Sequence, residues 1–121
     1  MAKILIVDDS AVSRKKLRSI LERADHEIVG EAGDGAEGME KYRALSPELV
    51  TMDITMPNVD GISVLKEIMQ YNPAARVVMI TALGKGETIL EALNSGAKNY
   101  ITKPFDADKV LDSVREALEQ A

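Results

Sequence analysis

The feature that most constrains the fold of this chain is a regular alternation between short apolar runs and longer amphipathic stretches. The apolar runs begin near residues 4, 28, 49, 77 and 99. Each is followed by a stretch with the apolar spacing of a helix, and the connections are short. Strict alternation of strands and helices indicates parallel strands, right-handed crossovers and helices on both faces of a sheet. The sequence therefore predicts one doubly wound α/β domain, a (βα)5 unit spanning residues 1–121.

Polar residues stand where four of these runs end. The first run leads into Asp8 and Asp9, and the third leads into Asp53. Thr81 ends the fourth run and Lys103 ends the fifth. Ligands of open α/β sheets bind outside the carboxyl ends of the strands. These five side chains are therefore expected at one edge of the sheet, and the three carboxylates converge there if the first and third strands are neighbours.

Three carboxylates at one edge repel one another. Two unit charges about 4 Å apart repel by roughly 4 kcal/mol at an effective dielectric of 20, and Lys103 supplies only one compensating charge. Protonation or a bound cation must relieve the repulsion. Mg²⁺ suits one or two carboxylates combined with water and a phosphoryl oxygen. A zinc site of the usual ligands is excluded, because the chain has no cysteine and one histidine.

Carboxylates, a divalent cation, an ammonium and a hydroxyl around one point favour phosphoryl transfer, because they neutralise charge on the transferring group. A carboxylate can itself be the nucleophile and form an acyl phosphate. Asp53 is the candidate nucleophile because it stands alone, while Asp8 and Asp9 remain to hold the cation. Taken singly, each residue has a plainer explanation, such as an N-cap, a core hydroxyl or a surface lysine. Their joint occurrence at four strand ends favours the functional one.

Composition and charge limit the classes of partner that the protein can bind. The net charge of −5 argues against autonomous nucleic-acid binding, and four aromatic residues offer no stacking platform for single strands. No apolar run approaches the roughly 20 residues that span a bilayer, and the N-terminus lacks the apolar core of a signal peptide. We therefore expect a cytoplasmic protein that binds neither nucleic acid nor membrane.

Local signals predict several helix ends and exposed groups. The fourth helix should end at Ser95-Gly96, with Ile89, Ala92 and Leu93 facing inward. His26 lies in a polar segment and is expected to be solvated. The basic residues from 14 to 23 are expected to form a solvated helix face, which could also contact an acidic partner. The predicted N-caps are Ser10, Asp34 (with Glu37 in a capping box), Asp60 and Asp106.

Along essentially its whole length the sequence resembles the receiver domain of two-component response regulators, and most of all the single-domain chemotaxis regulators of the CheY type. The resemblance implies a flavodoxin-like sheet with the strand order 2-1-3-4-5. The matching segments are Val7-Asp8-Asp9-Ser10, Met52-Asp53-Ile54-Thr55-Met56-Pro57 with Asp60-Gly61, Thr81-Ala82, Gly96-Ala97 and Lys103-Pro104-Phe105.

The resemblance implies a phosphoacceptor and a metal site. Asp53 would accept a phosphoryl group from a histidine kinase of the CheA type. Mg²⁺ or Mn²⁺ would be held by Asp9, Asp53 and the backbone carbonyl of Thr55, with Asp8 acting largely through water.

The resemblance also implies a switch. Thr81 and Lys103 would contact the phosphoryl group, and the Lys103–Pro104 peptide bond would be cis. Thr81 would move toward the phosphoryl oxygen, and Tyr100 would swing inward into the space that it leaves. The output surface would be the fourth helix, fifth strand and fifth helix, with Lys85, Lys98 and Lys109.

By this resemblance the protein is a monomeric switch with intrinsic autodephosphorylation, not a turnover enzyme. Its target would be the flagellar motor switch, and a phosphatase would be a further partner. An intermediate phosphate carrier in a phosphorelay would use the same site, and this alternative stays open.

Two other classes fit less well. Aspartyl-phosphate phosphatases carry an Asp-x-Asp motif on the first strand and need a cap over the substrate. This chain has the adjacent pair Asp8-Asp9 instead. A nucleotide or flavin module needs a Gly- or Ser/Thr-rich anion cradle after the first strand. Asp8-Asp9 places negative charge there instead.

Overall fold

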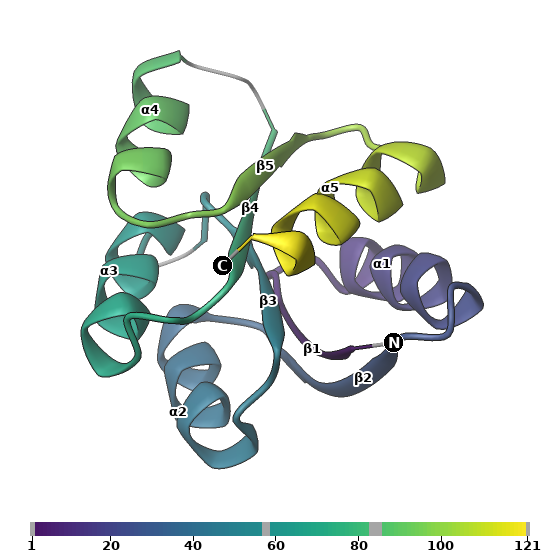
Figure 1. The fold of residues 1–121 in the computed structure, drawn as a ribbon, viewed down its shortest axis with the longest axis horizontal. Coiled ribbons are helices and arrows are strands. Elements are labelled where there is room, and N and C mark those ends of the chain that lie inside the picture. Colours follow the sequence, from purple (N-terminus) through teal and green to yellow (C-terminus); the bar gives the residue numbers. More distant parts are fainter. Residues whose placement is uncertain (1, 57–58, 83–85, 121) are drawn as a thin grey trace.

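The protein folds around a central parallel sheet, seen in a computed structural model that describes residues 2–56, 59–82 and 86–120. Within these residues, five parallel strands lie in the order β2-β1-β3-β4-β5 (Figure 1). The predicted doubly wound fold and its strand order are therefore confirmed. The strands are β1 (Lys3–Val7), β2 (Glu27–Ala32), β3 (Leu49–Asp53), β4 (Val77–Thr81) and β5 (Asn99–Thr102).

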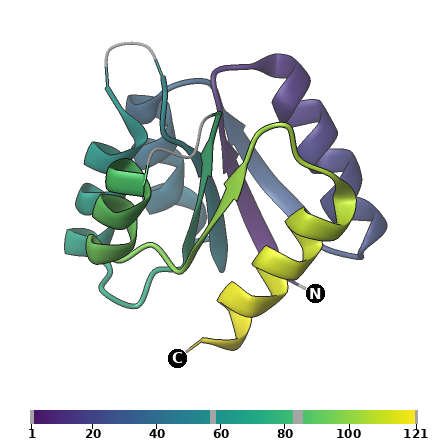
Figure 2. The same cartoon turned by 90° about the horizontal axis from the view of Figure 1, so that it is seen from above.

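Helices cover both faces of the sheet. α1 and α5 lie on one face, and α2, α3 and α4 lie on the other (Figure 2). Each of the four predicted N-cap side chains accepts a hydrogen bond from the backbone N–H three residues later, at 2.8–3.2 Å. In α2, Glu37 accepts from the N–H of Gly33 and not from that of the cap residue, as a capping box would require. The helices are α1 (Ala11–Arg23), α2 (Gly35–Leu45), α3 (Gly61–Tyr71), α4 (Gly86–Asn94) and α5 (Ala107–Glu119).

The side-chain alternation of β1 divides the core into two layers. Ile4 and Ile6 belong to the cluster formed with α1 and α5, while Leu5 and Val7 belong to the cluster formed with α2, α3 and α4. All four are buried, as expected for a central strand covered on both faces. Because β1, β3 and β4 are buried on both faces, the residues that follow them start at a rigid edge.

α4 differs from the prediction at one position. Ala92 is buried and Ile89 is partly buried, but Leu93 is 39% exposed. Successive residues are about 100° apart around a helix, so Leu93 leaves the face that Ala92 occupies. In the part of the chain that the structure describes, no helix is long and apolar enough to cross a membrane.

Candidate functional site

The acidic cluster forms where β1 and β3 end side by side. Val7 of β1 is in register with Met52 of β3, so Asp8 and Asp53 follow at the same level. Carboxylate oxygens of Asp8, Asp9 and Asp53 all lie within 4.8 Å of one another. The Asp8 and Asp53 residues are buried, and Asp9 is exposed. The three carboxylates therefore converge as the strand ends predicted.

Lys103 reaches this cluster from the end of β5. Its Nζ atom lies 3.1 Å from Oδ2 of Asp8 and 3.6 Å from Oδ2 of Asp53. The Lys103 backbone N–H donates to the carbonyl of Thr81 at 2.7 Å, and the Lys103–Pro104 peptide bond is cis. The lysine thus contacts two of the three carboxylates from a strand that neither carboxylate occupies.

The electrostatics of Asp53 reflect its crowded position. Burial, and then the neighbouring Asp8 carboxylate, raise the pKa of Asp53 from 3.8 to about 6. The Lys103 ammonium and the Thr55 backbone N–H, which donates to Asp53 Oδ1 at 3.3 Å, act in the opposite direction. One ammonium is therefore too little positive charge for this cluster, and an added cation would lower the pKa of Asp53.

The oxygen atoms of the cluster fit a hard divalent cation. Asp8 Oδ2 is buried and forms an ion pair with Lys103, but among the residues that the structure describes no donor is aligned to give it a hydrogen bond. It keeps coordination capacity that a cation can use. Carboxylate oxygens are the ligands that Mg²⁺ and Mn²⁺ accept. The backbone carbonyl of Thr55, two residues after Asp53, stays a predicted ligand.

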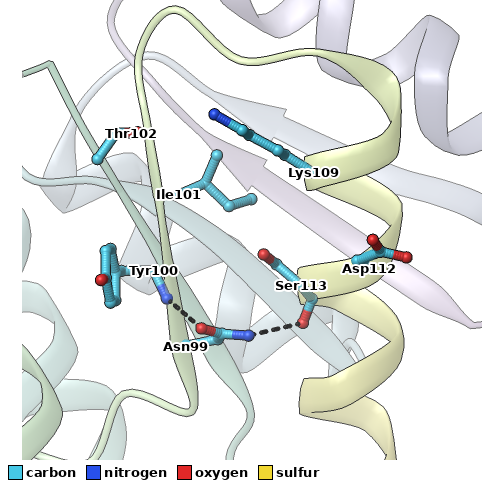
Figure 3. Close-up of a pocket in the computed structure, with 7 residues that line it drawn as sticks. All are labelled: Asn99, Tyr100, Ile101, Thr102, Lys109, Asp112 and Ser113. Atoms are coloured by element: carbon cyan, nitrogen blue, oxygen red, sulfur yellow. Dashed lines mark hydrogen bonds between the residues drawn. The ribbon is translucent and has the colours of Figure 1, made fainter.

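Thr81 and Tyr100 lie on the two strands beyond the acidic cluster. Asp53 is in register with Ile80 of β4, so Thr81 stands one residue beyond that level, and it is buried. Tyr100 of β5 is 40% exposed. Its ring and the Ile101 side chain point to opposite sides of the strand, with Ile101 toward the hollow between β5 and α5 (Figure 3). The exposed tyrosine is compatible with the predicted switch, which stays a prediction.

The structure explains why residue 61 is glycine, which the sequence motif did not. Its N–H donates to the carbonyl of Ile54 at 2.7 Å, which closes the start of α3 onto the end of β3. A Cβ atom at this position would stand 2.0 Å from the backbone carbonyl oxygen of Asp53. Only glycine fits there without a backbone shift, so Gly61 supports the placement of Asp53.

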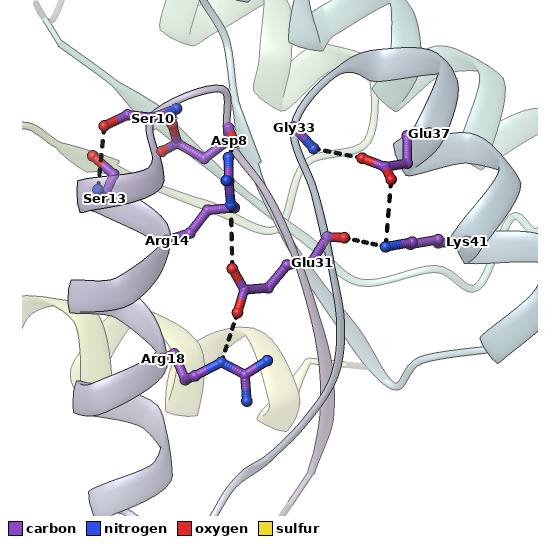
Figure 4. A network of polar contacts seen from close by, with 9 residues as sticks. All are labelled: Asp8, Ser10, Ser13, Arg14, Arg18, Glu31, Gly33, Glu37 and Lys41. Atoms are coloured by element: carbon purple, nitrogen blue, oxygen red, sulfur yellow. Dashed lines mark hydrogen bonds and ion pairs between the residues drawn. The ribbon is translucent and has the colours of Figure 1, made fainter.

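The prediction that the basic residues of α1 form a solvated face is wrong in part. Arg14 and Arg18 both form ion pairs with Glu31 of β2, and Lys16 donates to the carbonyl of Phe105 at 2.8 Å (Figure 4 shows the Glu31 contacts). The edge strand therefore contributes a charged residue near the site, which sequence reasoning missed. The available signal was a pair of arginines at i and i+4 on a helix that packs against an edge strand carrying Glu31.

His26 is also less solvated than expected. It is partly buried, and its Nδ1 atom accepts a hydrogen bond from the backbone N–H of Ala2 at 3.1 Å. Burial lowers the pKa of His26 from 6.5. Pro57, the last residue of the matching segment around Asp53, and Lys85, expected on the output surface, lie outside the described residues.

These features define a receiver domain, and comparison with known proteins agrees. Residues 4–115 match the response regulator receiver domain. The chain is 48% identical over 116 residues to the chemotaxis protein CheY of Bacillus subtilis, covering 96% of this chain and 97% of that protein. It is 45% identical to the protein CcdB of Bacillus subtilis, covering 98% of each chain.

A solved structure shows the same architecture. A chain in the crystal structure of the CheX-CheY-BeF3-Mg²⁺ complex from Borrelia burgdorferi superposes with a TM-score of 0.94 at 42% identity, covering 98% of this chain and 90% of that chain. The protein belongs to the response regulator receiver family. Its CheY-type relatives support a phosphorylation-activated switch of two-component chemotaxis signalling, and not a turnover enzyme.

Proposed function

We propose that Asp53 accepts a phosphoryl group from a histidine kinase and that the acyl phosphate switches the output surface of the protein. The observation that carries this proposal is the convergence of the Asp8, Asp9 and Asp53 carboxylates within 4.8 Å, with the Lys103 ammonium beside them. Asp53 is the buried member of this group that ends the central strand β3.

In the proposed reaction a carboxylate oxygen of Asp53 attacks the phosphorus of a phosphohistidine. A P–O bond forms as the P–N bond breaks, and the electron pair of that bond leaves with the imidazole nitrogen. A proton from solvent keeps the departing imidazole neutral. Only ionised Asp53 can attack; its pKa is about 6 without a cation, and a bound cation would lower that pKa and so widen the pH range in which Asp53 is competent. Lys103 and the Thr81 hydroxyl would contact oxygens of the transferred group.

Mg²⁺ or Mn²⁺ held by Asp9, Asp53 and the Thr55 carbonyl, with Asp8 acting through water, would neutralise charge on the transferring group. The requirement follows from charge, because three carboxylates and one ammonium would otherwise face an incoming phosphoryl group with net negative charge. The protein's own part is to hold the acceptor oxygen at a rigid strand end.

The proposed output surface is the face formed by α4, β5 and α5. Leu90 of α4 is 59% exposed and Tyr100 of β5 is 40% exposed, and Lys109 of α5 is exposed as well. Phosphorylation would draw Thr81 toward the phosphoryl group and favour an inward Tyr100, which is a population shift driven by differential contacts. The exposed apolar side chains here suit a protein partner.

We propose that this protein is cytoplasmic and monomeric and that its target is a flagellar motor switch protein. The chemotaxis relatives support this target, and the neighbouring structure of CheY with CheX supports a second partner, such as a phosphatase. A phosphate carrier that passes its phosphoryl group to another histidine would use the same acidic cluster.

Labelling with acetyl phosphate and Mg²⁺ tests the acceptor. Intact-mass spectrometry should show one added phosphoryl group on the wild type, none on Asp53→Asn, and none when Mg²⁺ is chelated. Asp106→Asn is the matched control, because it makes the same change at a helix cap on α5, and it should label like the wild type. Undiminished labelling of Asp53→Asn would refute the assignment.

Affinity capture tests the target. The BeF3-Mg²⁺ form and the untreated form would each be used to capture partners, and only the first should retain a motor switch protein. Retention of a histidine phosphotransfer protein with no motor component would instead favour the relay. Substituting Tyr100 by Ala should weaken capture without reducing labelling of Asp53.

A further inference from the structure

The backbone at the end of β1 is held by an arginine that the proposed reaction does not use. Arg14 on the first turn of α1 donates through Nη1 to the backbone carbonyl of Asp8 at 2.6 Å. Its Nε atom donates to Oε1 of Glu31 at 3.2 Å (Figure 4). One guanidinium therefore joins the edge strand β2 to the peptide unit between Asp8 and Asp9.

Other contacts complete the grip on Asp8. Its backbone N–H donates to the carbonyl of Ala32 on β2 at 3.0 Å, and its Oδ1 atom accepts from the N–H of Ser10 at 2.8 Å. A peptide unit is planar, so fixing the direction of the Asp8 carbonyl also fixes the starting direction of Asp9. The orientation of this one plane therefore constrains the directions in which the Asp8 and Asp9 side chains leave the backbone.

Glu31 is itself held in place. Its Oε2 atom accepts from Nε of Arg18 at 2.6 Å, and its backbone carbonyl accepts from Nζ of Lys41. The side chains of Arg14 and Glu31 are 22% and 29% exposed. The Arg14 guanidinium therefore binds a Glu31 that Arg18 and Lys41 also hold in place. The Arg14 and Glu31 side chains are both partly shielded from water.

We propose that Arg14, oriented by Glu31, is a positioning residue of the cation site: it presets the Asp8–Asp9 peptide unit so that both carboxylates face the cation before it binds. This inference rests on the proposed role of the acidic cluster as a cation site. Arginine suits the task because Nε and Nη1 donate in fixed directions, which a lysine ammonium cannot reproduce.

Charge and positioning predict opposite results, which makes the inference testable. Arg14 is positively charged and repels a cation, so removing its charge should by itself strengthen cation binding. Loss of positioning should weaken it. Residues that orient metal ligands typically cost about 10- to 100-fold in metal affinity when they are changed. A decrease in cation affinity on Arg14→Gln therefore cannot be produced by the loss of charge alone.

The experiment measures Mn²⁺ binding to the unphosphorylated protein by electron paramagnetic resonance of free Mn²⁺. Arg14→Gln and the charge-conserving Arg14→Lys should both bind Mn²⁺ about tenfold more weakly than the wild type. Lys15→Gln is the matched control: it removes a positive charge from the residue next to Arg14 on α1, at an exposed side chain where water screens the charge. It should bind Mn²⁺ like the wild type.

Thermal unfolding without cation establishes which variants are folded at the titration temperature. If Arg14→Gln is not folded, Arg14→Lys decides the question, since it keeps the positive charge but loses the fixed donor directions of the guanidinium. Wild-type affinity in the folded Arg14 variants, or stronger binding by Arg14→Gln with unchanged Arg14→Lys, would overturn the inference alone. A wild type that binds no Mn²⁺ would overturn the proposed cation site and this inference together.

Discussion

The Nζ atom of Lys103 lies 3.1 Å from Oδ2 of Asp8, a buried oxygen for which the described part of the chain provides no aligned hydrogen-bond donor. At that oxygen the negative charge of Asp8 is therefore balanced by the Lys103 ammonium and not by an aligned hydrogen bond. The same ammonium lies 3.6 Å from Asp53, so it is shared between the residue proposed to help hold the cation and the proposed phosphoacceptor. Any change at Lys103 should affect both carboxylates.

Removing the shared ammonium should destabilise the cation-free protein. Lys103→Gln leaves the buried Asp8 carboxylate without its ion pair, and we expect a loss of about 1–3 kcal/mol in urea unfolding near neutral pH, allowing for the partial exposure of Lys103. Mg²⁺ should restore part of this loss. The control is Lys66→Gln, which breaks an exposed pair with Glu91 and should cost about 0.5 kcal/mol or less. Equal losses in the two variants would contradict the prediction.

Asp53 should destabilise the cation-free fold at neutral pH. Its folded-state pKa, about 6, lies above the ordinary value of 3.8. Its favourable contribution is therefore complete below that ordinary value and is lost as the pH rises through about 6. Asp53→Asn should raise the free energy of unfolding by at most about 3 kcal/mol near pH 7.5, and by much less near pH 4. Denaturant unfolding at both pH values measures this, and an equal gain at the two pH values would contradict the prediction.

A divalent cation should stabilise the wild type more than the acceptor variant. A ligand that binds only the folded state adds about 2.7 kcal/mol at 100 times its Kd. Mg²⁺ should therefore raise the Tm of the wild type in a concentration-dependent way, and a chelator should reverse the shift. Asp53→Asn removes one charged ligand and should show a smaller rise in differential scanning fluorimetry. An identical rise in both proteins would place the cation elsewhere.

Gly61 should not tolerate a side chain. The added Cβ of Gly61→Ala would stand 2.0 Å from the backbone carbonyl oxygen of Asp53, so the loop must move. We expect a loss of about 3 kcal/mol or more in stability together with slower acetyl phosphate labelling. Gly86→Ala is the matched control, because a Cβ there meets nothing within 4 Å among the residues that the structure describes, and helix propensity favours alanine. It should be neutral or slightly stabilising.

His26 should make the fold sensitive to mild acid. Burial lowers the pKa of His26 below its ordinary 6.5, and the neutral ring accepts a bond from Ala2. The unfolded chain therefore takes up a proton before the folded one does. This contribution is complete above 6.5 and is lost as the pH falls below that value. Stability of the wild type relative to His26→Gln should decline between about pH 7.5 and 5.5 in denaturant unfolding. A constant difference would contradict the prediction.

Much of the fold follows from local patterns in the sequence. The apolar run of Ile4 to Val7 marks a strand buried on both faces, and Asp60 marks the start of α3 through its bond to the N–H of Ser63. Such signals are local because strand alternation and helix capping involve residues close in sequence. Leu93 was misassigned for the complementary reason: the apolar residues of α4 do not by themselves show which of them the sheet covers.

The residues at the strand ends can be read from the amino-acid sequence alone, and with them the placement of Asp8, Asp9 and Asp53 at one edge of a parallel sheet. Parallel strands bring their carboxyl ends to the same edge whatever the details of packing. Two contacts emerge only from the packed fold: Arg14 joins the Asp8 carbonyl to Glu31, and Lys103 lies closer to Asp8 than to Asp53. These contacts join residues of different elements, and the way α1 and β5 pack beside β1 and β3 sets their distances.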